Sequence, residues 1–159
     1  MSEPHREIRI PSTAAIYSHP LHPMLVTFPI AFLIGALASD LAFWWSGDPF
    51  WARASFWLIA GGLVGGTAAA LAGMTDFLTI PKIREMTRGW GHFLAAVVVI
   101  SFASANFMLR WEDPATGVLP WGVLISAITA VMLAVTGYLG GKLVFHELVG
   151  TYLPEKEEP

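Results

Sequence analysis

The sequence contains no cysteine and few charged residues. Without cysteine the chain has no disulfide, no cysteine-ligated iron–sulfur cluster, no thiol nucleophile and no thiolate metal ligand. Asp, Glu, Lys and Arg make up 13% of the 159 residues, against about 25% in soluble domains. With nine Lys and Arg and a net charge of −3, the chain has no basic surface for nucleic acid. These absences exclude thiol chemistry and nucleic-acid binding, and they argue against a water-soluble globule.

What the sequence has in abundance is apolar residues, at 55% of the chain and a mean hydropathy of +0.59. They are concentrated in four stretches, at about 23–45, 54–78, 93–109 and 121–145. A helix needs about 20 apolar residues to cross the hydrocarbon layer, and no stretch alternates as a barrel strand would. The sequence therefore predicts an all-α integral membrane four-helix bundle.

The connections between these stretches are short, which makes sequential helices antiparallel and favours an up-down-up-down bundle. We divide the chain into a polar N-terminal segment (1–20), a single transmembrane domain (21–150) and an acidic tail (151–159).

Because positive charges favour the cytoplasm, their uneven distribution predicts that both termini are cytoplasmic and that the protein is multi-pass in the cell inner membrane. Seven lie on the side of the termini, and only Arg53 and Arg110 lie on the other; the seven are Arg6, Arg9, Lys82, Arg84, Arg88, Lys142 and Lys156. Tryptophans cluster towards the opposite ends of the spans, as an interfacial aromatic belt would: Trp44, Trp45, Trp51, Trp57, Trp111 and Trp121.

Most of the histidines fall at one depth in such a bundle. The start of the first span, the end of the second, the start of the third and the end of the fourth meet on the side of the termini. These positions hold His22, Asp76, His92 and His146, with His19 a short step away. Polar groups at the edge of the hydrocarbon layer are costly and usually functional, so this set is the candidate site.

The helix dipole distinguishes the members of this set. His22 and His92 lie at helix N-termini, where the dipole disfavours imidazolium, so we expect neutral rings with a lone pair available to a metal. His146 lies at a C-terminus beside Lys142 and is read equally well as an interfacial histidine or as a third ligand. Asp76 lies near a helix C-terminus, where a carboxylate is disfavoured. We expect either a basic partner for it or a role in orienting a ligand histidine.

Three functions are compatible with these residues. The first is a module that binds haem b for electron transfer. The first and third spans are diagonal in such a bundle, so we expect His22 and His92 to face each other across its centre as axial ligands, with His146 as a substitute and cations at the propionates. Those cations are Arg84, Arg88 and Lys142. The second is a cofactor-free structural or assembly subunit of a larger membrane complex. The third is a membrane hydrolase in which three histidines and a carboxylate bind zinc or copper, although no nucleophile pair supports it.

We do not expect the chain to act as an enzyme on its own. Its expected partners are the lipid bilayer, a redox partner or larger membrane complex, and a second copy of itself as a homo-oligomer.

Two further features predict contacts between helices. Asp40, near the end of the first span, is expected to form an interhelical ion pair with Arg110 or Arg53. Small residues recur every four positions along the second span, and such ridges let helices approach closely in lipid; they are Gly61, Gly65, Ala69 and Gly73. The alternative is that glycines near the terminal side make room for a flat prosthetic group, namely Gly73, Gly137, Gly140 and Gly141.

Several local motifs resemble one known family. The run HPLHPMLVTFPI at 19–30 closely resembles the opening signature of a bacterial group of four-helix membrane proteins, the domain of unknown function DUF2231. GMTDF at 73–77, His92, and GGKLVF at 140–145 are similar to its later signatures. The resemblance implies no established activity, but some members are joined to Rieske-type domains, which implies membrane redox work. His22, Asp76 and His92 match the family pattern, whereas FHELVG at 145–150 shifts His146 by a residue from it.

Overall fold

The computed structural model describes residues 9–152, and within them four long apolar helices make up the fold. The first eight residues and most of the predicted acidic tail lie outside the described residues, and with them Arg6 and Lys156. The helices of transmembrane length are Leu21–Ser46, Pro49–Thr79, Thr87–Leu109 and Val118–Phe145. The predicted all-α four-helix membrane bundle is confirmed. The elements, in chain order, are β1 (Ala15–Ile16), β2 (His19–Pro20), α1 (Leu21–Leu25), α2 (Thr27–Ser46), α3 (Pro49–Thr79), α4 (Pro81–Glu85), α5 (Thr87–Leu109), η1 (Val118–Gly122) and α6 (Val123–Phe145).

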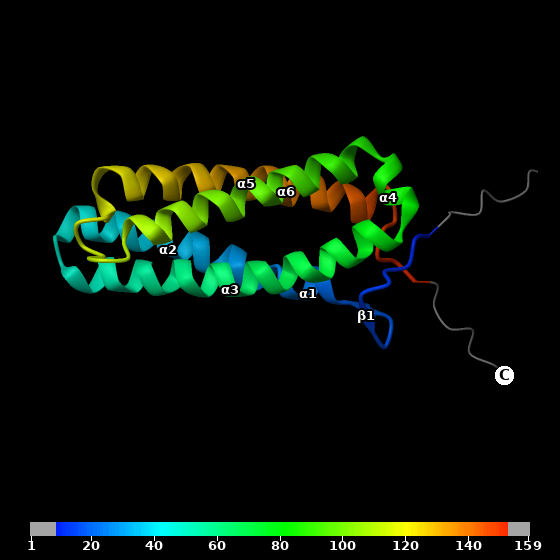
Figure 1. Ribbon diagram of the computed structural model, residues 1–159, viewed down its shortest axis with the longest axis horizontal. Coiled ribbons are helices and arrows are strands. Elements are labelled where there is room, and N and C mark those ends of the chain that lie inside the picture. Colours follow the sequence, from blue (N-terminus) through cyan, green and yellow to red (C-terminus); the bar gives the residue numbers. More distant parts are fainter. Residues whose placement is uncertain (1–8, 153–159) are drawn as a thin grey trace, which may run out of the picture.

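The four helices run side by side, with their connections at alternate ends (Figure 1). α2 packs on α3 and α6, and α5 packs on the same two helices, so α1–α2 and α5 are diagonal in the bundle. Figure 1 shows both ends of the described chain at one end of the bundle, where Arg9 Nη1 donates to the Tyr152 carbonyl at 2.7 Å. We call this the terminal end. The far end carries the turns at Gly47 and Gly117.

The helices extend beyond the apolar runs that predicted them. α3 begins at Pro49 rather than near residue 54, because Asp48 caps it: the Asp48 carboxylate accepts from the Phe50 amide at 2.9 Å. Proline at the first helical position suits such a start. α5 begins at Thr87 rather than near residue 93. A charged residue, Arg53 in α3 and Arg88 in α5, separates each of these first turns from its apolar run, so the runs alone do not mark where the two helices begin.

The first span is divided in two near its start. α1 ends at Leu25 and α2 begins at Thr27. Pro29 has no amide hydrogen to donate to the Leu25 carbonyl four residues earlier, and its ring crowds that carbonyl. The break at Val26 follows from this proline.

Glycines on α3 give the bundle its close packing. A Cβ added at Gly62 would lie 2.8 Å from the Leu33 side chain, and one at Gly66 would lie 2.8 Å from Ile100. The predicted ridge packs in the same way, because a Cβ at Gly61 would lie 3.2 Å from Phe32 and one at Gly65 would lie 3.3 Å from Pro29. The apolar core lies in the middle of the bundle and consists of Leu33, Val99 and Ala103, flanked by Leu63, Met132 and Leu133. Large apolar side chains cover much of the outer surface, which suits lipid contact.

Candidate functional site

Two histidines from diagonally opposite helices meet inside the terminal end of the bundle. His22 lies on α1 and His92 on the first turns of α5. Their ring centroids are 5.8 Å apart and the ring planes are perpendicular. The structure therefore brings together the two residues that the sequence predicted to face each other across the bundle.

Each ring is oriented by a hydrogen bond to a backbone carbonyl of a neighbouring helix. Nδ1 of His22 lies 2.8 Å from the Ala69 carbonyl of α3, and Nδ1 of His92 lies 3.0 Å from the Thr136 carbonyl of α6. A carbonyl oxygen only accepts, so each Nδ1 carries a hydrogen, and in the neutral ring the Nε2 lone pair is free.

The Nε2 atoms of the two rings make no hydrogen bond within residues 9–152. In the same part of the chain no buried side-chain nitrogen or oxygen lacks a hydrogen-bond partner. Neither Nε2 is therefore sealed inside the packed interior. Both imidazoles are fixed in place, and each leaves its Nε2 without a hydrogen-bond partner among the described residues.

Glycines make room for the two rings. A Cβ at Gly73 would lie 2.8 Å from Nδ1 of His22, and a Cβ at Gly140 would lie 3.1 Å from Cε1 of His92. By contrast, a Cβ at Gly137 would meet nothing within 4 Å. Of the glycines considered for a prosthetic group, Gly73 and Gly140 therefore line the histidine pair.

Asp76 has a different partner from the one expected. It is buried, and its carboxylate accepts from the amides of Thr13 and Ala14 at 2.8 and 2.9 Å and from the Ser12 hydroxyl at 2.6 Å. These donors, rather than Lys82, Arg84 or a histidine, compensate the carboxylate near the end of α3. Asp76 fixes the N-terminal segment to the bundle and does not hydrogen-bond to either ring.

The remaining two histidines lie apart from the pair. His146 is exposed at the C-cap of α6, where its Nε2 lies 3.3 Å from Lys142 Nζ. His19 is exposed in the N-terminal hairpin, and its Nδ1 donates to the Tyr17 carbonyl at 2.7 Å. Within residues 9–152 no three or more His, Asp or Glu side chains are grouped so that they could hold one metal ion. The expected ring of four residues therefore reduces to a pair of histidines.

The candidate propionate cations are engaged in local contacts. Arg84 Nη1 donates to the Phe77 carbonyl at 2.6 Å and also to the Leu78 carbonyl, which satisfies the end of α3. Arg88 forms an ion pair with Glu147. Lys142 lies 5.5 Å from the centroid of the Tyr138 ring.

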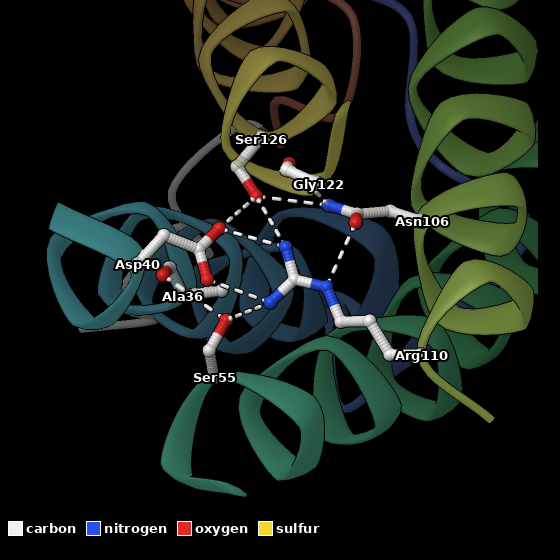
Figure 2. Close-up of polar contacts among 7 residues, drawn as sticks. All are labelled: Ala36, Asp40, Ser55, Asn106, Arg110, Gly122 and Ser126. Carbon is white, nitrogen blue, oxygen red and sulfur yellow. Dashed lines mark hydrogen bonds and ion pairs between the residues drawn. The ribbon is translucent and has the colours of Figure 1, made fainter. Parts of the chain in front are cut away.

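A second polar layer lies at the far end of the bundle, around a buried arginine (Figure 2). The Arg110 guanidinium binds the Asp40 carboxylate through both terminal nitrogens, at 2.6 and 2.8 Å. The other guanidinium bonds are Nη1 to Ser55 Oγ at 2.7 Å, Nη2 to Ser126 Oγ at 3.4 Å and Nε to Asn106 Oδ1 at 2.9 Å. All five donors of the guanidinium are used.

This layer connects all four membrane helices. Asp40 comes from α2, Ser55 from α3, Asn106 from α5 (with Arg110 as its C-cap) and Ser126 from α6. The Ser126 hydroxyl donates to Asp40 at 2.6 Å, and both charged side chains are 0% exposed. The ion pair expected from the sequence is confirmed with Arg110 as the partner. The two serines and Asn106 were not predicted, because isolated small polar residues in an apolar run give no sign of which direction they face.

The two polar layers are separated by apolar packing. His92 and Arg110 are 18 residues apart along α5, about 27 Å at 1.5 Å per residue, which is close to the roughly 30 Å hydrocarbon thickness. The core around Leu33, Val99 and Ala103 lies between them. Within residues 9–152, no chain of side-chain hydrogen bonds connects one layer to the other.

Comparison with known proteins identifies a family over nearly the whole chain. Residues 18–152 match the family described as predicted membrane protein (DUF2231). No curated protein and no solved structure matches the chain.

Proposed function

Since the chain belongs to the DUF2231 family of predicted membrane proteins, we propose that it is a multi-pass membrane module that holds haem b between His22 and His92. The observation that supports this is the pair of fixed imidazoles, each with its Nδ1 bonded to a carbonyl and its Nε2 unused. Histidines that bind metals are usually held in this way through the second ring nitrogen.

The donor set favours haem over a bare metal ion. Closed zinc sites use four protein ligands and catalytic ones three, whereas only two histidines meet here and no third His, Asp or Glu joins them within residues 9–152. A porphyrin would supply four nitrogens of its own, so the protein would need to contribute only the two histidines. For the same reason we do not propose the metal-dependent hydrolase.

The two ring centroids lie 5.8 Å apart, so both imidazoles would contribute to the same site. When bound, haem supplies one-electron transfer, and the role of the protein is to hold and orient the two imidazoles.

The wider setting of the site belongs to the same proposal. The excess of Lys and Arg at the terminal end supports a cytoplasmic orientation for the histidine pair in the cell inner membrane. Arg84, Arg88 and Lys142, each already in a local contact, are the proposed contacts for the propionates. A redox partner or larger membrane complex, and a second copy of the chain, remain the proposed protein partners.

One observation favours a second function, that of a cofactor-free structural or assembly subunit. The two histidine bonds cross-link α1 to α3 and α5 to α6, so the same contacts hold the bundle together without any cofactor. The two functions differ in what they require of the ring. Haem needs Nε2, whereas the structural role needs only the Nδ1 hydrogen.

The variant His92→Asn separates these requirements, because the asparagine amide can donate near the position of Nδ1 but has no counterpart of Nε2. We would purify the protein in detergent after haem is supplied and record spectra of the oxidised and dithionite-reduced forms, with elemental analysis of the same samples. The proposal expects a Soret band that shifts on reduction in the unmodified protein. It expects loss of that band in His92→Asn and retention in the matched control His146→Asn.

Other outcomes would overturn the haem proposal. A colourless sample that contains stoichiometric zinc or copper would assign the histidines to a bare metal ion. A colourless, metal-free sample, with His92→Asn as stable as the unmodified protein, would favour the structural function.

A further inference from the structure

The N-terminal segment forms a tight hairpin just before the first membrane span. β1 and β2 pair antiparallel, with Ala15 opposite Pro20 and Ile16 opposite His19. The two turn residues, Tyr17 and Ser18, both have left-handed backbone angles, with φ of 46° and 61°. This is the turn geometry that suits two-residue hairpins, and the bond from His19 Nδ1 to the Tyr17 carbonyl closes it.

The base of the hairpin is fixed to the bundle. The carboxylate of Asp76, on α3, accepts from the amides of Thr13 and Ala14, and the Leu21 amide donates to the Ala14 carbonyl at 2.8 Å. The hairpin therefore lies between two anchored points, Asp76 on one side and the start of α1 on the other. Its tip is held in a defined position relative to the helices.

The side chains at the tip of the hairpin, Ile16 and Tyr17, are exposed. Tyr17 is 92% exposed and Ile16 is 56% exposed, so the rest of the described chain leaves both side chains largely uncovered. Figure 1 shows the hairpin beside the start of α1, projecting from the side of the bundle rather than along its axis. Leu21 opens the first transmembrane helix, so the hairpin adjoins the end of that span, at the level where headgroups would lie.

We infer that the hairpin tip, Ile16 and Tyr17, is a membrane-interface anchor that inserts among lipid headgroups. Tyrosine is suited to that layer because its ring is apolar and its hydroxyl can hydrogen-bond to water or to a headgroup. A non-glycine residue in the left-handed region is held there at some energetic cost, and here that conformation turns an aromatic side chain outwards. The anchor would set the depth at which the histidine end of the bundle lies.

The absence of cysteine makes a direct test available. Tyr17→Cys would be labelled with an environment-sensitive fluorophore and placed in vesicles of phosphatidylcholine and phosphatidylglycerol that carry nitroxide lipids. The nitroxide would be either on the headgroup or at a defined depth along the acyl chain. The matched control is Glu85→Cys, an exposed position of α4 at the axial end of the bundle (Figure 1). A second variant, Ser18→Cys, examines the same turn without removing the tyrosine.

We expect headgroup nitroxide to quench the label at 17 and at 18 several-fold more than the label at 85. Quenching at 17 and 18 no greater than at 85 would overturn the anchor and leave a protein partner as the occupant of the tip. Strongest quenching by nitroxide deep in the acyl chain would also overturn the assignment to the headgroup layer. None of these outcomes depends on whether the histidine pair binds haem.

Discussion

Removing the carboxylate of Asp40 should destabilise this protein severely. In the folded bundle that carboxylate accepts two bonds from Arg110 and one from Ser126, and the ion pair is completely buried. The substitution Asp40→Ala leaves the guanidinium completely buried, with two of its five donors unpaired. Its charge is then uncompensated.

The expected loss in the free energy of unfolding follows from these contacts. Hydrogen bonds to charged groups contribute about 1.5–3 kcal/mol each, and breaking a buried ion pair from one side costs about 3–5 kcal/mol. Two lost charged bonds and an orphaned arginine therefore predict a loss of about 3–5 kcal/mol in the free energy of unfolding. The double variant Asp40→Ala/Arg110→Met should lose less than the two single variants together, because it removes both charges.

The assay is reversible unfolding in mixed micelles of mild detergent and dodecyl sulfate, followed by circular dichroism. Asp113→Ala is the matched control: Asp113 is exposed, and among residues 9–152 its carboxylate accepts only from the nearby Ala115 amide. We expect it to cost about 1 kcal/mol or less. A loss below about 1 kcal/mol for Asp40→Ala, or strict additivity in the double variant, would refute the reasoning that the layer depends on charge pairing.

Two further substitutions test the terminal end. Asp76→Ala removes the acceptor of the Thr13 amide, so hydrogen exchange at that amide should accelerate about tenfold or more while amides in the middle of the transmembrane helices keep their rates. Gly140→Ala places a methyl group 3.1 Å from His92 and should cost about 1–3 kcal/mol with a shift of the His92 ring resonances. Gly137→Ala, which meets open space, should be neutral or slightly stabilising.

An unchanged rate of hydrogen exchange at the Thr13 amide in Asp76→Ala would mean that the Asp76 carboxylate does not fix the N-terminal segment. Equal stability of the two glycine variants would mean that the histidine ring does not depend on the close approach of α6.

Hydrophobicity and length were enough to predict the fold class. Apolar runs long enough to cross a bilayer, joined by short polar connections, leave few arrangements other than an antiparallel helical bundle. Chain order along such a bundle also predicted that His22 and His92 lie on diagonal helices at one level. A carboxylate and an arginine in otherwise apolar helices predicted their own pairing, because neither charge is tolerated alone.

The direction of each side chain around its helix was decided only by tertiary packing. Successive residues of a helix differ by about 100° in direction, so depth alone did not show that His146 turns outwards while His92 turns inwards. The partner of Asp76 was equally hidden, because Thr13 and Ala14 offer backbone amides, which carry no mark in the sequence. The rotation of each helix about its axis is set by contacts between helices, such as that of Gly62 of α3 with the Leu33 side chain of α2. That fit is a property of the assembled bundle rather than of any one helix.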